Sequence, residues 1–185
     1  MTNSTGWRLM PKVVTRLCAM LFILSYPWGA AAADAELDAV RAGVEGVYAL
    51  EEWHTESGVF RPPQVEGRAS LMNGTIIVIL HNRMNESPQT TVASYGTYLL
   101  TPTEFSYRYT EPSVFTVTPS SITVSHKPPW EGMRTFNVSR EGNAVRLRSP
   151  TGAQEFLFSP EGLTYSDAGT GAFVGKRVYR RVVAE

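Results

Sequence analysis

The 185-residue sequence lacks three things: a second cysteine, an excess of charge of either sign, and an apolar run long enough to cross a bilayer. The apolar run at 17–24 is about half of the ~20 residues that a membrane-spanning helix needs. The single cysteine, Cys18, lies inside that run, preceded by Thr15-Arg16-Leu17, which does not fit a lipoprotein attachment site. The 17 basic residues balance 17 acidic ones, which gives no support to nucleic-acid binding, since that usually needs a concentrated basic face.

Residues 1–33 have the composition of a secretory signal peptide. Three basic residues and no acidic one precede the apolar run, which is followed by Pro27, Gly29 and four small residues at 30–33. Cleavage after Ala33 would leave Asp34 as the first mature residue. We therefore expect a secreted or periplasmic protein with no membrane span after cleavage. An uncleaved membrane anchor is the alternative.

The expected mature domain, residues 34–185, is nearly neutral and free of cysteine. Residues 1–33 hold three of the 17 basic residues and none of the 17 acidic ones, which leaves 14 and 17, a formal charge of −3. Without cysteine the domain has neither a disulfide nor a thiol nucleophile. Its length, about 150 residues, is enough for one domain with a hydrophobic core.

The pattern beyond the expected cleavage site is one of strands. Leu37 and Val40 predict a short N-terminal helix over 34–42 that ends at Gly43. Period-two runs, turn residues and the absence of a βαβ rhythm then predict an antiparallel, all-β barrel or sandwich. The expected strands are 47–53, 68–72, 75–80, 91–100, 104–109, 121–126, 133–139, 144–148, 154–158 and 176–183.

Four short segments predict the turns between these strands. Asn73-Gly74 is typical of a two-residue hairpin, and turns are also expected at Gly142-Asn143, 150–152 and 160–162. The glycine-containing segment 167–171 is expected to form a loop before the last strand, and phosphate binding there is disfavoured because no helix follows it.

Alternation within the strands predicts which side chains face the core. In 104–109 the three aromatic residues share one face and the polar residues share the other. The run 76–80 is apolar on both faces, so we expect it to lie centrally, under the helix or at an oligomer interface.

Several blocks of sequence, in their order, resemble a known family. The segment GVEGVYALEEW resembles the first strand of calycin barrels, where a G-x-W motif follows a short helix, and Gly46-Val47-Tyr48 occupies that place here. The blocks LMNGTIIVIL, ASYGTYLL and PPWEGMRTFNVSREGNAVRLRSP, with the closing Val178-Tyr179-Arg180-Arg181, resemble a bacterial and fungal lipocalin-like domain family. The resemblance extends over 44–182. It implies an antiparallel up-and-down lipocalin-like β-barrel of about 8–10 strands with a short N-terminal helix.

In such a barrel the glycines that precede the first strand would allow a sharp turn out of the helix. The resemblance implies that Tyr48 lies at the closed end of the barrel, where Arg180 or Arg181 could stack across its ring. We interpret Tyr48 and Arg180 as residues that close the barrel and not as ligand contacts.

A barrel of this size can enclose one small ligand. Aromatic walls with a few hydroxyl groups suit a small hydrophobic or aromatic molecule, although the same rings could simply fill the core. Phe105 is one of the aromatic residues that could form such a wall. The residues expected to bind the ligand are Tyr95, Tyr98, Tyr107, Tyr109, Trp130 and Phe136.

The three histidines are spaced too widely to predict a metal site, and no cofactor is expected. Whether the protein is an enzyme stays open. An isomerase or cyclase could use His81 with Arg83 near Glu86, or His126 beside Trp130 and Arg134.

A third alternative is a solidly packed barrel that meets a partner protein. The contact would be made by exposed loops such as 128–132, which contains Trp130.

Overall fold

The computed structural model describes residues 28–168 and 175–183. The chain divides into two compact units, residues 1–35 and 36–185. The described part of the first unit is the beginning of helix α2 (Trp28–Val44), so most of the expected signal peptide lies outside the described residues. The helix starts before the predicted residue 34 and ends within two residues of the predicted end. Within the described ranges, no helix combines the length and the apolar character that crossing a membrane requires.

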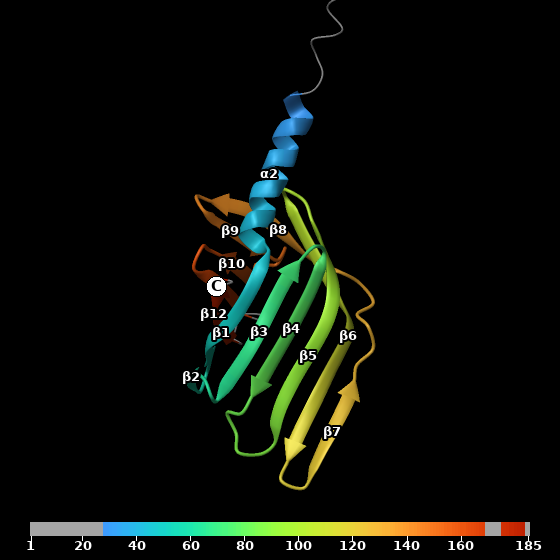
Figure 1. Ribbon diagram of the computed structural model, residues 1–185, viewed down its shortest axis with the longest axis vertical. Coiled ribbons are helices and arrows are strands. Elements are labelled where there is room, and N and C mark those ends of the chain that lie inside the picture. The colour runs from blue at the N-terminus through green and yellow to red at the C-terminus, as the bar shows by residue number, and fades with distance from the viewer. Residues whose placement is uncertain (1–27, 169–174, 184–185) are drawn as a thin grey trace, which may run out of the picture. The chain divides into compact units, whose positions relative to one another are not determined.

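Twelve strands follow α2 in the described chain, and every pairing between them is antiparallel (Figure 1). All ten predicted strands are present, while β2 and β11 were not predicted. The strands are β1 (Gly46–Thr55), β2 (Gly58–Phe60), β3 (Val65–Met72), β4 (Thr75–Asn82), β5 (Gln89–Leu100), β6 (Glu104–Thr118), β7 (Ser121–His126), β8 (Arg134–Glu141), β9 (Ala144–Arg148), β10 (Gln154–Phe158), β11 (Gly162–Asp167) and β12 (Gly175–Val182).

Ten of these strands close into a barrel. The order β1-β3-β4-β5-β6-β8-β9-β10-β11-β12 follows the sequence, and β12 then pairs with β1 from Val182↔Val47 to Lys176↔His54. β2 and β7 lie outside this ring, paired with β1 and β6. The predicted all-β, antiparallel up-and-down barrel with a short helix is therefore confirmed.

The turns form where the sequence predicts them. Asn73 and Gly74 join β3 to β4 with positive φ angles of 51° and 78°, the conformation that a two-residue hairpin requires. Gly142 and Gly152, with φ of 63° and 74°, lie in the turns that follow β8 and β9. Most of the predicted loop at 167–171 lies outside the described residues.

The C-terminal turns of α2 pack against one end of the barrel. Val40 and Val44 are fully buried and join the same core cluster as Tyr48 and Val145. Gly43 allows this close packing, because a Cβ atom there would lie 2.6 Å from a methyl carbon of Val145. A glycine is thus required where the helix meets the barrel.

Arg181, and not Arg180, closes this end with Tyr48. The Arg181 guanidinium lies 5.4 Å from the centre of the Tyr48 ring and donates hydrogen bonds to the Tyr48 hydroxyl (2.9 Å) and the Gly43 carbonyl (2.7 Å). Tyr48 in turn donates to the carbonyl oxygen of Val44 at 2.8 Å. Arg180 was the wrong choice because alternation along β12 turns its side chain outward, where it pairs with Glu51 at 3.1 Å.

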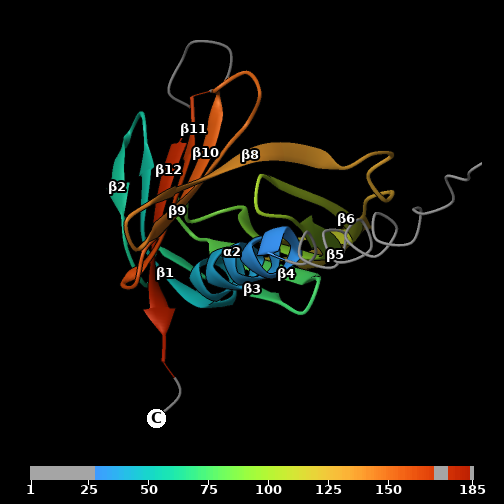
Figure 2. The same cartoon turned by 90° about the horizontal axis from the view of Figure 1, so that it is seen from above.

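One wall of the barrel is longer than the other. β6 pairs with β5 along 105–117 but with β8 only along 104–107, and β7 pairs with 113–118 of β6 instead. Residues 89–95, 112–118 and 121–126 of β5, β6 and β7 therefore form a sheet extension beyond the barrel, which is the lower part of Figure 1. Figure 2, viewed from above, shows β8–β12 as the wall that faces β3–β6.

The outer face of β4 is open to solvent. Ile76 and Leu80 point into the core, as the alternation requires, whereas Ile77 and Ile79 are 39% and 38% exposed. Of the two alternatives given for this strand, coverage by the helix is wrong, because α2 packs at the end of the barrel and not along its side (Figure 1). The other, an oligomer interface, stays a prediction.

Candidate functional site

A set of aromatic rings lines the interior of the barrel. Alternation along β6 turns Phe105, Tyr107 and Tyr109 inward, with ring centroids 5.7 and 5.5 Å apart in that order. Trp130, in the connection between β7 and β8, lies 5.6 Å from Tyr107 and 4.9 Å from Tyr109. Its backbone N–H donates to the Tyr109 carbonyl at 3.0 Å, which fixes the connection against β6.

The opposite wall adds a second group of rings. Phe156 on β10 lies 4.7 Å from Tyr165 on β11 and 6.3 Å from Tyr107, measured between ring centroids. Since these rings meet edge-on or tilted, they form stable contacts and still leave space between the walls.

That space is a cavity of about 210 Å³. It is smaller than the roughly 300–1,000 Å³ of sites for drug-sized molecules, so it suits a compact ligand. Its apolar floor is formed by Ala69, Leu71, Ile76, Val78, Leu147 and Leu163. Its rings are Phe105, Tyr107, Tyr109, Trp130, Phe156, Phe158, Tyr165 and Tyr179, and its charged residues are Arg134 and Arg177.

The structure divides the six residues predicted to bind a ligand into three groups. Tyr107, Tyr109 and Trp130 line the cavity. Tyr98 and Phe136 are buried core residues that do not border it, so for these two the rings simply fill the core. Tyr95 points out of the barrel and is 43% exposed, which places it outside the cavity.

The two arginines that line the cavity both stack on aromatic rings. The Arg134 guanidinium lies 4.0 Å from the centre of the Trp130 ring. Arg177 lies 4.2 Å from the Trp53 ring and 5.4 Å from the Tyr165 ring. Such cation–π contacts hold a guanidinium in place without using its hydrogen-bond donors. Among the described residues the Arg177 Nε atom is buried with no hydrogen-bond partner.

The hydroxyl of Tyr165 belongs to a polar cluster next to Arg177. It donates to the Asp167 carboxylate at 3.0 Å, and the Gln154 side-chain amide donates to the same carboxylate at 2.9 Å. The described residues that line the cavity include two guanidinium groups and no carboxylate. The guanidinium groups of Arg134 and Arg177 offer hydrogen-bond donors to a negative group of a bound molecule. The Asp167 carboxylate, bound to the Tyr165 hydroxyl, supplies the nearest negative charge.

The tyrosine hydroxyls of the site are neutral hydrogen-bonding groups. Burial raises the pKa of Tyr107, Tyr109 and Tyr179, and the positive charge of Arg134 or Arg177 offsets only part of this rise. Burial also raises the pKa of Tyr165, and its hydrogen bond to Asp167 raises it further. None of the four is positioned to act as a phenolate base near neutral pH.

The two histidines considered for proton transfer lie outside the cavity. His81 is on the outer face of β4, where its Nδ1 lies 2.8 Å from the Thr91 hydroxyl, and His126 on β7 is hydrogen-bonded to Ser113 at 3.0 Å. Arg83 pairs with Glu66 at 2.8 Å and not with Glu86. Neither histidine can therefore reach a molecule held inside the barrel.

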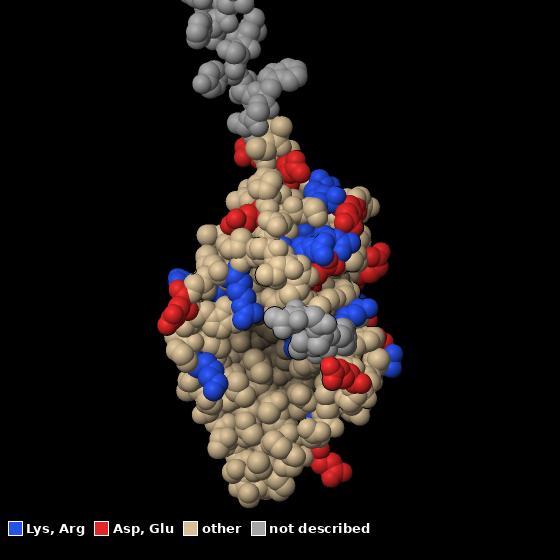
Figure 3. Space-filling model, turned by 180° about the vertical axis from the view of Figure 1, so that it is seen from behind, with Lys and Arg blue, Asp and Glu red and all other residues tan. Residues whose placement is uncertain are grey.

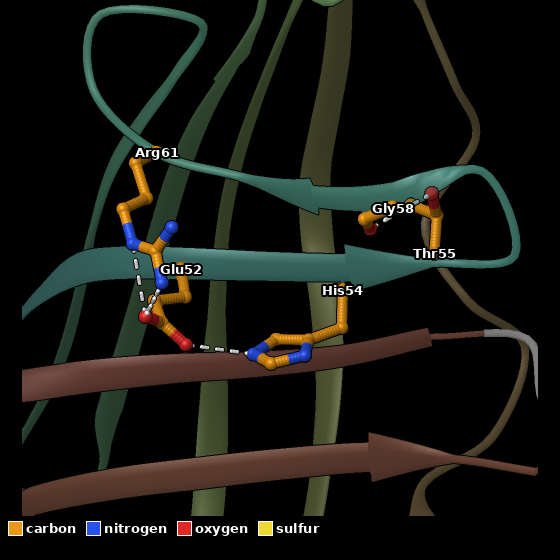
Figure 4. Close-up of polar contacts among 5 residues, drawn as sticks. All are labelled: Glu52, His54, Thr55, Gly58 and Arg61. Atoms are coloured by element: carbon orange, nitrogen blue, oxygen red, sulfur yellow. Dashed lines mark hydrogen bonds and ion pairs between the residues drawn. The ribbon is translucent and has the colours of Figure 1, made fainter.

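The third histidine belongs to a polar cluster on the surface at the β1–β2 hairpin. Glu52 accepts hydrogen bonds from Arg61 Nε at 3.0 Å and pairs with His54 Nε2 at 2.8 Å (Figure 4). Both contacts lower the pKa of Glu52, and the hydrogen bond from Arg61 has the larger effect. Thr55 donates to the Gly58 carbonyl at 3.4 Å within the same hairpin. In the described ranges no three His, Cys, Asp or Glu side chains gather as metal ligands.

Sequence reasoning missed the contributions of β10, β11 and β12 to the cavity. Arg177 and Tyr179 lie two residues apart and share a face, as do Phe156 and Phe158. That alternation is visible in the sequence, but it does not reveal which face of a strand points into the barrel.

No family model matches this chain, and no curated protein or solved structure is significantly similar to it. The class that the structure itself defines is a closed, ten-stranded antiparallel β-barrel with an aromatic internal cavity.

Proposed function

We propose that the protein is an exported, secreted or periplasmic, lipocalin-like binding protein that holds one compact aromatic or apolar molecule with an acidic group. The observation that carries the proposal is the cavity of about 210 Å³, whose described lining has ring walls, two guanidinium groups and no carboxylate. Apolar walls bind the body of a ligand, and a few polar groups at one place orient it.

The acidic group would be bound by Arg177. Its Nε donor is buried without a partner among the described residues, and an unsatisfied buried donor costs free energy that a ligand oxygen would recover. The stacking of Arg177 on Trp53 keeps the guanidinium in one orientation before a ligand arrives. Arg134, stacked on Trp130, is the second cation that a carboxylate could approach.

Isothermal titration calorimetry with matched ligands tests this function. We would compare 4-tert-butylbenzoate with its neutral amide, within a panel of one-ring and two-ring aromatic acids and their amides. The expected result is binding of at least one acid with a stoichiometry of one per chain and more tightly than its amide. No binding by any member of the panel would contradict the proposal.

A pair of variants on β12 supplies the control. Arg177 points into the cavity and Arg180 points outward to Glu51. Arg177→Met should weaken binding of the acid by roughly tenfold or more, since a charged hydrogen bond is lost, and should leave binding of the amide unchanged. Arg180→Met should change neither. Equal losses in both variants would place the acid outside the cavity.

A further inference from the structure

The sheet extension is free of charged side chains. Residues 69–82, 87–103 and 112–126 contain no Asp, Glu, Lys or Arg, although the chain has 34 such residues, 17 of each sign. Figure 3 shows the corresponding lower end of the molecule as an almost unbroken surface of other residues. On the outer face of the extension Ile122 is 71% and Val124 48% exposed.

The extension ends in an unpaired strand edge. β7 pairs with β6 from Ser121↔Thr118 to His126↔Ser113, and no described strand pairs with its other side. The Lys127 N–H donates to the Pro112 carbonyl at 2.8 Å. Because hydrogen-bonding residues alternate along an antiparallel ladder, residues 121, 123 and 125 bond to β6. The N–H and C=O groups of Ile122, Val124 and His126 therefore point away from the sheet.

This edge carries none of the features that prevent pairing with another strand. Within 121–126 there is no lysine, no proline and no bulge, and all six residues are exposed. By contrast, the outlying strand β2 is only three residues long. An exposed, regular and uncharged edge is a template for a further strand.

We propose that β7 pairs with β7 of a second copy of this chain, antiparallel and about a two-fold axis at Val124. In this register Val124 faces Val124 of the other copy, and Ile122 faces His126. The outward N–H and C=O groups of these three residues then bond to each other in about six hydrogen bonds. The inference goes beyond ligand binding and does not depend on it.

The chemistry of the edge favours a second copy over another partner. A two-fold axis brings identical segments together, which is tolerated only where like charges do not meet, and neither the edge nor its neighbours on β5 and β6 carry charge. The pairing also extends one apolar face, because Ile122 and Val124 share a side with Val117 and Phe115 of β6.

Sedimentation velocity on the purified full chain, over a range of concentrations, tests the pairing. The wild type should show a concentration-dependent dimer. Val124→Pro removes the N–H at the axis but no bond to β6, so it should fold and should be monomeric. Val124→Thr is the matched control, because it keeps the N–H and the β-branched shape and should remain dimeric. A monomeric wild type, or a dimer that survives Val124→Pro, would overturn the proposal.

Two further variants keep the test decisive should Val124→Pro fail to fold. Val124→Lys places like charges opposite each other at the axis and should weaken the dimer by roughly tenfold or more. Val124→Cys, in a Cys18→Ser background, should form a disulfide-linked dimer on mild oxidation, since facing Cα atoms about 5.5 Å apart permit the bond. Failure to cross-link in a sample that still dimerises would exclude this register.

Discussion

The barrel and the sheet extension share two strands, β5 and β6, and differ in what covers them. Within the barrel β6 contributes Phe105 and Tyr107, which are buried against rings from the opposite wall. Beyond Tyr109 the same strand runs past the end of β8, and Val117 is left exposed. A single strand can thus form a sealed wall over one half of its length and an open sheet over the other.

The two regions also differ in how they treat charge. At the cavity, guanidinium groups are held over rings, and Arg177 has a buried donor without a partner in the described chain. The extension instead contains no charged side chain at all. Under the two proposals, the barrel binds the polar group of a ligand, whereas the extension pairs with an uncharged surface.

The largest expected difference between the two regions is their response to alkaline pH. Burial raises the pKa of Tyr107, Tyr109, Tyr165 and Tyr179 above the ordinary value of 10.0. The unfolded chain therefore loses these protons first, so the stability present below pH 10 is lost as the pH rises from 10 toward the folded pKa values. Each fully buried tyrosine contributes a loss of at most about 1.4 kcal/mol per pH unit in that window, and the partly exposed Tyr165 contributes less.

Urea unfolding at several pH values between 8 and 11.5 measures this loss. Tyrosine absorbance should show delayed ionisation in the folded protein, and the barrel should unfold at the upper end of the range. Unchanged stability up to pH 11 would mean that the four hydroxyls are accessible to water.

Removal of a core ring should have the next largest effect. Phe136 is buried, with ring centroids of Phe156 at 5.2 Å and Tyr107 at 5.9 Å. Phe136→Ala should lower the free energy of unfolding by about 3–5 kcal/mol, because it creates a cavity among rings that cannot close up. Ile122→Ala in the extension is the comparison, with an expected change within about 0.5 kcal/mol in a monomer. Similar losses in both variants would show that the extension is packed against something.

The closing arginine should have a smaller effect. Arg181→Met removes the donors to the Gly43 carbonyl and the Tyr48 hydroxyl and should cost about 1.5–3 kcal/mol. Arg180→Met removes only the exposed pair with Glu51 and should cost about 0–1 kcal/mol. Thermal unfolding of the two variants side by side measures the difference, and equal melting temperatures would contradict the assignment of Arg181 to barrel closure.

Much of the fold could be predicted because it depends on local patterns. Alternation in 104–109 identified an inward aromatic face, and Asn73-Gly74 identified its hairpin. The expected strand 104–109 is much shorter than β6, which continues to Thr118. The strand continues for two reasons. Its register against β5 shifts by one residue between Glu111 and Tyr109. The Pro112 nitrogen, which has no hydrogen to donate, faces Lys127 and not β5.

The site was less predictable because it depends on which faces meet across the barrel. Tyr95 and Tyr98 are three residues apart, so a strand turns them to opposite faces, and only Tyr98 points inward. The spacing shows that the two residues lie on opposite faces of the strand, but it does not show which of them points inward. The place of Arg177 could not be predicted, since it depends on the pairing of β12 with both β1 and β11.

Native mass spectrometry of the gently purified wild type, beside Arg177→Met and Val124→Pro, tests the ligand-binding proposal most directly. The account predicts an extra small mass on the wild type that is lost on denaturation and belongs to an acidic aromatic or apolar compound. That mass should be reduced in Arg177→Met and retained, one per chain, on monomeric Val124→Pro. A released compound without an acidic group, or equal occupancy in the Arg177→Met variant, would contradict the assignment of the cavity to a ligand acid.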